Sequence, residues 1–306
     1  MAEPADSTSS LSLSLSLPAD FRRDDFMALH RRDAQELSER VTELSLSKGL
    51  LWRGAPACLS MDFVADAVRV GLDADVPPQA GDAAALAAMA RRMLGLTQPV
   101  AEFERAHHGH PQLGGLIAAR PGLRVPQTST PFEALVWAVT GQQISVHAAI
   151  SLRRRLMQLV GKRHGGGLLC HPSPEQLAAL EPEQLGQAGF SRAKTRTLLE
   201  LSRRTADGDL PLQGWLDGGA PEEIAARLLA LPGIGPWTVS YALLRGYGWL
   251  DGSLHGDVAV RRGLQRLLER EEAVSPRETE QWLQGFAPWR ALVGAHLWAM
   301  QTAAAY

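Results

Sequence analysis

The sequence predicts an α+β protein in which a small mixed unit comes first and a larger helical part follows. Two observations support this prediction. Short β-like segments are confined to the residues before Pro77-Pro78, and helical patterns succeed one another after that point. A chain of 306 residues, 45% of them hydrophobic, is also long enough to bury one large core or two of moderate size.

The N-terminal part is expected to divide into a tail and a small folded unit. Serine and leucine alternate over residues 10–17, which is also a strand pattern, but the repeat is low in complexity, so residues 1–18 are predicted to be a disordered tail. A helix is expected over residues 24–41, and β-like segments follow within residues 49–76. We therefore predict an α+β domain over residues 19–90.

Helical periodicity dominates the remainder, and we predict an all-α domain over residues 91–306. Two helix starts are chemically explicit. Ser173-Pro174 and Ser275-Pro276 each place serine at an N-cap and proline at the first helical position, with Gln or Glu three residues after the cap. No strand pattern of comparable strength occurs after residue 100.

Composition excludes several classes of protein. Cys58 and Cys170, the only cysteines, fit no C-x-x-C pattern, which argues against a disulfide framework, a structural zinc and a four-thiolate iron–sulfur cluster. No run approaches 18 apolar residues and no basic segment precedes an apolar one at the N-terminus, so we expect a cytoplasmic, nucleoid-associated protein without a membrane partner.

The middle of the chain is locally basic although the formal charge is only −2. Residues 151–210 contain 10 Lys and Arg against 6 Asp and Glu. Such a clustering suits a polyanionic partner, although solvated helix faces produce similar clusters more often. Charge alone therefore decides nothing about function.

A glycine turn lies between two segments of helical period, at Leu231-Pro232-Gly233-Ile234-Gly235. Glycine amides in such a turn, together with the free N–H groups of the next helix, can bind an anion such as a phosphate. Taken alone, a Gly-x-Gly turn is more often an ordinary interhelical connection. Trp237 and Tyr241 follow on one helix face, and Asp257 precedes an amphipathic helix as a good N-cap, so that the three form a constellation with the turn.

Residues 231–265 resemble the helix-hairpin-helix and the following loop with an aspartate that define a superfamily of base-excision DNA glycosylases. Within it, the similarity is to the bacterial 3-methyladenine DNA glycosylase II family, and it extends to residues 118–126, 132–145 and 288–298. The resemblance implies an N-terminal domain like half of a TATA-binding protein, followed by a helical glycosylase domain.

The resemblance also implies an activity and its residues. The expected function is base excision repair: an alkylated base of the 3-methyladenine or 7-methylguanine type is flipped out of double-stranded DNA and its N-glycosidic bond is hydrolysed. Asp257 matches the family's catalytic aspartate, and Trp237, Tyr241 and Trp298 match aromatic positions of its base pocket. Bifunctional members carry a lysine where this chain has Trp237, so the resemblance implies a monofunctional enzyme that leaves an abasic site.

Further assignments concern the DNA backbone. The resemblance implies phosphate contacts by Gly233, Ile234, Gly235 and Thr238, a Na⁺ or K⁺ ion on backbone carbonyls, no required cofactor, and a monomer. The carbonyls that match the ion site are those of Leu229, Leu231 and Ile234.

Two departures from the family pattern stand near the site. Gln143 occupies the position of the side chain that fills the gap left by the flipped base, where the family typically has leucine. His255-Gly256-Asp257 replaces a loop that carries a proline and a second aspartate in the similar family. Asp257 is therefore the only carboxylate in the key stretch of this loop.

Two alternatives to this function stay open. Helix-hairpin-helix elements also serve as phosphate-binding modules without catalysis, and the presence of Asp257 with the aromatic set disfavours this alternative. A glycosylase for deaminated or oxidised purines would keep the chemistry and change only the substrate.

Overall fold

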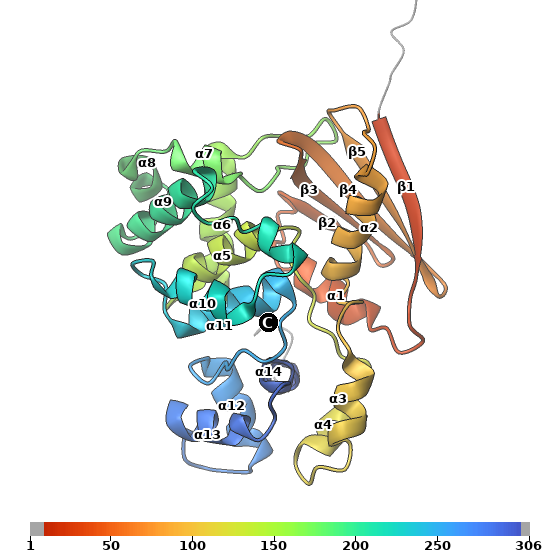
Figure 1. Ribbon diagram of the computed structural model, residues 1–306, viewed down its shortest axis with the longest axis vertical. Helices are drawn as coiled ribbons and strands as arrows, with labels where there is room; N and C mark the ends of the chain where they lie inside the picture. The colour runs from red at the N-terminus through yellow and green to blue at the C-terminus, as the bar shows by residue number, and fades with distance from the viewer. Residues whose placement is uncertain (1–8, 301–306) are drawn as a thin grey trace, which may run out of the picture.

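The structure is a computed structural model of the chain and describes residues 9–300. A β-sheet unit forms one corner of the molecule, and the helices form two further groups beside and below it (Figure 1). Each group has its own cluster of buried apolar side chains. This arrangement confirms the predicted order of a mixed N-terminal unit followed by a helical part.

The sheet unit consists of an antiparallel sheet with the strand order β1-β5-β4-β3-β2 and two helices. The strands and helices of this unit are β1 (Ser9–Ser16), β2 (Glu39–Val41), β3 (Ser45–Trp52), β4 (Ala55–Val64), β5 (Ala67–Ala74), α1 (Arg23–His30) and α2 (Asp82–Met93). Alternate residues of β4 and β5 are buried under α1 and α2, as expected for a sheet with one covered face.

The prediction of a disordered tail over residues 1–18 is wrong for the residues of β1, while residues 1–8 lie outside the described residues. β1 pairs antiparallel with β5, with Leu13 opposite Val70. Leu15 is 4% exposed whereas the intervening serines face solvent. The alternation of serine and leucine is thus the pattern of an edge strand with one buried face. Pairing with β5 and packing on the core of the sheet stabilise this strand, which the repeat would not form alone.

The predicted helix over residues 24–41 ends early, because α1 stops at His30. Residues Glu39–Val41 form β2 instead, and Glu39 lies opposite Lys48 of β3. Its carboxylate enters a buried group of charges, which outweighs the local helix preference. At the other end of the unit, α2 continues across the predicted domain boundary at residue 90, and Leu94 still packs in the core of the sheet.

The helical part is built from short helices. They are α3 (Val100–His107), α4 (Leu113–Ala119), α5 (Pro131–Gly141), α6 (Val146–Val160), α7 (Pro174–Ala178), α8 (Pro182–Gln187), α9 (Arg192–Ala206), the 3₁₀ turn η1 (Gly214–Asp217), α10 (Pro221–Leu229), α11 (Pro236–Ala242), the π-helical turn η2 (Leu243–Tyr247), α12 (Val258–Leu267), α13 (Pro276–Gln284) and α14 (Arg290–Ala299). Both predicted capping boxes, at Ser173 and Ser275, are present. No helix within residues 9–300 is both long and apolar enough to cross a membrane.

The two helical groups meet along α5 and α11. In α11, Val239 is buried among the side chains of α5 to α10, whereas Tyr241 is buried among those of α3, α4 and α12 to α14. In α5, Val139 likewise packs in the first of these groups and Ala138 in the second. A side chain at this junction therefore faces the space between two rigid groups, which is where binding sites commonly form.

Candidate active-site groove

A groove of about 930 Å³ runs along this junction. Its walls come from the α5–α6 turn, the turn between α10 and α11, α11 itself, the residues just before α12, and α14. The predicted residues Gly233, Gly235, Trp237, Thr238, Tyr241, Asp257, Trp298 and Gln143 all line it. The structure thus brings together positions that are spread over more than 150 residues of sequence.

Asp257 is the N-cap of α12, and its carboxylate is held from several sides. Oδ1 accepts hydrogen bonds from the backbone amides of Ala259 and Val260, at 2.8 and 3.1 Å. The indole Nε1 of Trp298 donates to Oδ1 at 3.1 Å, and Nε1 of Trp237 donates to Oδ2 at 2.9 Å. One carboxylate oxygen therefore caps the helix, while the other is fixed by a single indole at the groove wall.

The aromatic side chains form a continuous set around this carboxylate. The ring centroids of Trp237 and Tyr241 are 5.4 Å apart, and those of Tyr241 and Trp298 are 6.4 Å apart. Trp137 of α5 also lines the groove, and sequence reasoning missed it because it lies in an apolar helical pattern like any core residue. Such a set offers ring faces for a flat, unsaturated ligand beside a negative charge.

The predicted hairpin is present between α10 and α11. Gly233 has φ of 86°, and a Cβ there would come within 2.0 Å of Thr197 Oγ1, so glycine is required by both conformation and space. Ile234 is 5% exposed and its side chain packs in the core, so only its backbone is available to a ligand. Leu231 is also buried, and its carbonyl already accepts a hydrogen bond from the Ile234 amide.

A side chain that the sequence did not single out fixes the hairpin to α5. Nε2 of Gln142 donates to the Gly233 carbonyl and to Thr238 Oγ1, each at 2.9 Å. The neighbouring Gln143 is exposed at the groove with φ of 56°, and Ile144 beside it is 38% exposed. The α5–α6 turn therefore presents one polar and one apolar side chain at the groove, beside a clamped hairpin.

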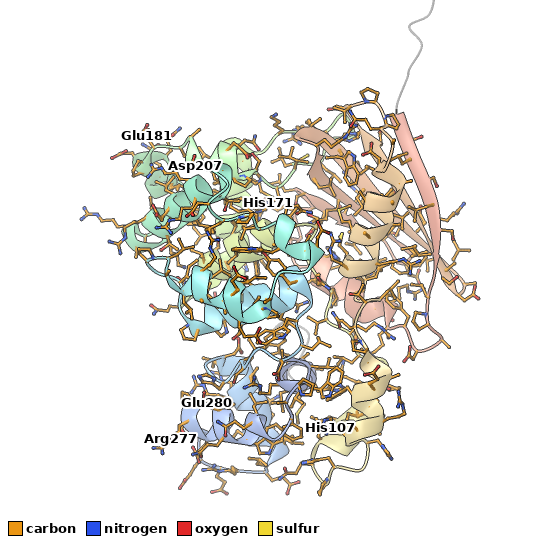
Figure 2. All side chains as sticks on the ribbon, in the orientation of Figure 1. His107, His171, Glu181, Asp207, Arg277 and Glu280 are labelled. Atoms are coloured by element: carbon orange, nitrogen blue, oxygen red, sulfur yellow. The ribbon has the colours of Figure 1, made fainter. Side chains whose placement is uncertain are left out.

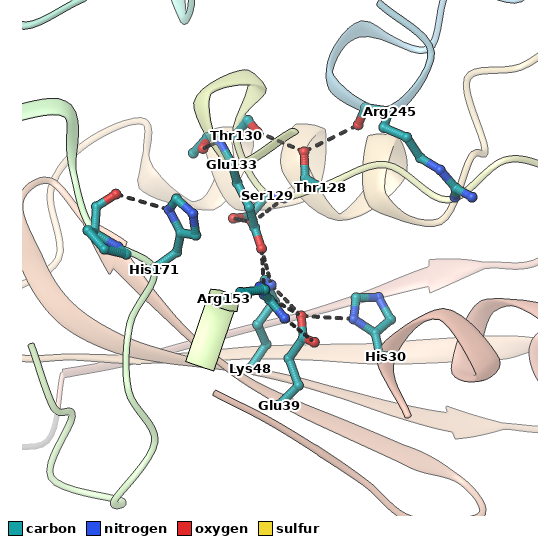
Figure 3. Close-up of polar contacts among 11 residues, drawn as sticks. His30, Glu39, Lys48, Thr128, Ser129, Thr130, Glu133, Arg153, His171 and Arg245 are labelled. Carbon is teal, nitrogen blue, oxygen red and sulfur yellow. Dashed lines mark hydrogen bonds and ion pairs between the residues drawn. The ribbon is translucent and has the colours of Figure 1, made fainter. Parts of the chain in front are cut away.

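A buried group of charges joins the sheet unit to α5 and α6 (Figure 3). Lys48 Nζ donates to Glu133 at 2.7 Å and also binds Glu39, while Arg153 binds Glu133 at 3.0 Å and Glu39 at 3.2 Å. Burial disfavours ionisation of Glu133, but Lys48, His171 and Arg153 together outweigh burial and hold the pKa of this carboxyl well below its usual range. The group therefore contains two cationic and two anionic side chains. One of each comes from the strands β2 and β3, and one of each comes from the helices α5 and α6.

Three arginines that were not predicted also line the groove, namely Arg32, Arg245 and Arg262. Arg32 follows α1 in the sheet unit, and Arg245 lies in η2. Arg245 is 5% exposed and its Nη1 donates to the Pro126 carbonyl at 2.8 Å.

No group of His, Cys, Asp and Glu side chains that could hold a metal ion occurs in the described residues 9–300.

The fold and the groove match one family of proteins, and the chain belongs to it. The model of the HhH-GPD superfamily of base excision DNA repair proteins matches residues 136–288. This stretch contains the hairpin, Trp237, Tyr241 and Asp257, and it confirms the resemblance identified in the sequence.

Curated relatives share this part of the chain. DNA-3-methyladenine glycosylase 2 of Escherichia coli K12 is 34% identical over 188 residues, which are 61% of this chain and 63% of the relative. A probable bifunctional transcriptional activator/DNA repair enzyme AlkA of Mycobacterium tuberculosis is 32% identical over 69% of this chain and 42% of its own length. The matched stretch thus spans less than two thirds of each of these relatives.

Solved structures confirm the fold. A 3-methyladenine DNA-glycosylase from Archaeoglobus fulgidus superposes with a TM-score of 0.77 over 94% of this chain and 97% of that chain, at 20% identity. The Schizosaccharomyces pombe 3-methyladenine DNA glycosylase Mag1, solved in complex with abasic DNA, gives a TM-score of 0.58 over 66% of this chain at 22% identity. The sheet unit therefore belongs to the shared architecture of the first of these two neighbours.

Proposed function

We propose that this protein is a monofunctional DNA glycosylase that removes alkylated bases of the 3-methyladenine and 7-methylguanine type from double-stranded DNA. The observation that carries the proposal is the carboxylate of Asp257, fixed by the indoles of Trp237 and Trp298 at the wall of an aromatic groove. The family of the chain and the names of its relatives support the same chemistry.

The reaction follows from the charge that develops at the sugar. When the bond between C1′ and the base breaks, its electron pair leaves with the base and the sugar becomes oxocarbenium-like. Asp257 stabilises this positive charge or orients the water that adds to C1′, and the water gives up one proton to the Asp257 carboxylate or to solvent. A base alkylated at a ring nitrogen is cationic and leaves as a neutral molecule, so the site need not supply a strong acid.

The position of Trp237 bears on the type of reaction. An amine at this place could attack C1′ and form a Schiff base that leads to strand cleavage, but an indole is not a nucleophile of this kind. In this structure Trp237 instead donates its N–H to the carboxylate. We therefore infer that hydrolysis ends at an abasic site without a lyase step.

DNA would be held by the rim of the groove. Gly233 and Gly235 leave the hairpin backbone uncovered at the groove, and we propose that the amides of Gly233, Gly235 and Thr238 bind a phosphate next to the lesion. The amide of Ile234 joins them when it exchanges its hydrogen bond to the Leu231 carbonyl for one to the phosphate. A Na⁺ or K⁺ ion on the carbonyls of Leu229, Leu231 and Ile234 would add to this contact. Gln143 would fill the space that the flipped base leaves, with Ile144 as its apolar neighbour.

The test is base release from methylated duplex DNA in single-turnover assays of wild-type protein and Asp257→Asn. The asparagine retains an oxygen that can cap α12 but lacks the charge, so release should fall about 100-fold or more while binding to abasic DNA persists. Asp207→Asn, at an exposed position at the end of α9, is the matched control and should release bases at the wild-type rate (Figure 2).

Other outcomes would select other functions. Release of only deaminated or oxidised bases by the wild type would change the substrate class, and binding without release from any lesion would indicate a non-catalytic DNA-binding protein. Cleavage of the strand without added base or heat would refute the monofunctional reaction. Gel filtration of the free protein and of its DNA complex would test the monomer that we propose.

A further inference from the structure

Arg32 and Arg245 form the deep end of the groove. Both also line a cavity of about 60 Å³ that lies behind it, together with Trp137 and Tyr241. Because they come from the sheet unit and from η2, they approach the same space from two different parts of the fold. Figure 3 shows that the guanidinium of Arg245 extends away from the buried charge group. The contact with Thr128 in this view is made by the backbone carbonyl of Arg245 and not by its side chain.

These two guanidinium groups have unused hydrogen-bonding capacity. Within residues 9–300 neither has a carboxylate within ion-pair distance, and the Nε of each is buried without an acceptor. The side-chain amide of Gln127, 1% exposed on the wall of the same cavity, also lacks partners among these residues. An arginine has five N–H donors and no acceptor, so such a pair favours a ligand that brings acceptor atoms.

The arginines also set the charge of the pocket. Arg245 lies over the ring of Trp298 at 5.7 Å and Arg32 over that of Trp137 at 6.0 Å, so one face of each indole already contacts a cation of the protein. Burial is the main reason that the pKa of Arg32 falls to about 10; Tyr241 opposes this fall and Arg245 adds to it. A guanidinium has only donors, so the two side chains favour a base that presents an acceptor toward them.

We infer that Arg32 and Arg245 recognise the acceptor edge of the flipped base, and that the site therefore prefers purines with a 6-oxo group over purines with a 6-amino group. This inference rests on the proposed function and refines its substrate class. A guanidinium can donate to the O6 acceptor of a 6-oxo purine, which 7-methylguanine keeps although its N7 is methylated, whereas the 6-amino group of an adenine is itself a donor. The two arginines therefore favour release of 7-methylguanine and hypoxanthine relative to 3-methyladenine.

The experiment uses methylated duplex DNA, in which 7-methylguanine and 3-methyladenine occur together. Both are cations, so charge does not explain a change in the ratio of their release rates, and comparison of each variant with the wild type cancels their intrinsic difference in reactivity. In Arg245→Met and in Arg32→Met this ratio should fall about tenfold or more below the wild-type ratio. Release of hypoxanthine, a neutral base, from a defined duplex should fall by a similar factor relative to 3-methyladenine.

Two controls make the result specific. Arg245→Lys and Arg32→Lys keep the positive charge but lose the planar guanidinium, so the ratio of 7-methylguanine to 3-methyladenine release should fall in these variants too. If circular dichroism shows that a methionine variant is unfolded, the lysine variant at the same position tests the inference in its place. Arg277→Met, on the exposed surface of α13, should keep the wild-type ratio (Figure 2).

The two proposals fail in different ways. If the wild type releases none of the three bases, the glycosylase function itself is refuted. If the wild type releases them and the ratio stays at the wild-type value in the folded arginine variants, only the recognition by Arg32 and Arg245 is refuted.

Discussion

At the scale of single residues, the hydrogen bonds to Asp257 are the central feature of the site. Trp237 and Trp298 were predicted from the family resemblance as walls of a base pocket, and both line the groove. Their N–H groups also bind the carboxylate, at 2.9 and 3.1 Å. The two tryptophans therefore act as positioning residues for Asp257 as well as ring faces for the base, in the proposed mechanism.

This double role predicts the effect of Trp237→Phe. The phenylalanine keeps an aromatic ring but removes the donor to Asp257 Oδ2, and a hydrogen bond to a charged group is worth about 1.5–3 kcal/mol. We expect the rate of base release under single-turnover conditions to fall by at least about tenfold, with smaller loss in binding to abasic DNA. Equal losses in rate and binding would instead show that the indole acts mainly through packing.

At the scale of elements, the buried charges fix the sheet unit against α5 and α6. The group contains Glu133 and Arg153, on α5 and α6, which also line the groove, and Glu39 and Lys48, on β2 and β3 of the sheet unit. Arg32 is held near the groove by the same packing of α1 and β2 against the helices. The relative placement of the sheet unit and the helices is therefore part of the site.

Removing one cation from this group should be costly. Lys48→Met leaves Arg153 as the one Lys or Arg side chain bound to the two buried carboxylates among residues 9–300. Breaking a buried pair in this way costs about 3–5 kcal/mol of the free energy of unfolding, measured by urea denaturation. The double variant Lys48→Met/Glu133→Gln restores the charge balance and should recover much of this loss. Additive losses in the double variant would contradict the charge explanation.

At the scale of the whole molecule, two buried histidines link stability to pH. Burial is the main cause that lowers the pKa of His171 and that of His296 to about 4, from 6.5. Below pH 6.5 the unfolded chain binds protons that the folded chain does not, so the free energy of unfolding decreases as the pH falls from about 6.5 to about 4. Each histidine contributes at most about 3 kcal/mol to this change.

His296→Leu tests the contribution of one of them. The ring of His296 packs 5.4 Å from that of Phe103, and an apolar side chain of similar size can replace it there. Urea denaturation at several values between about pH 7 and pH 5 should show a smaller decrease in stability for the variant than for the wild type. A decrease of the same size would mean that His296 does not titrate in this range.

The sequence by itself determined the class of fold and the hairpin, because these features depend on local patterns such as helical period on both sides of Gly233 and Gly235 and N-capping residues. The candidate catalytic set came from the resemblance of residues 231–265 to a known family. The tertiary structure decided the rest. Strand β1 and the early end of α1 depend on pairing with β5 and β3. Arg32 reaches the groove from the sheet unit, and Trp137 and Arg245 line it from α5 and η2, where the two helical groups meet. Such contacts join residues far apart in the chain, and no local pattern encodes them.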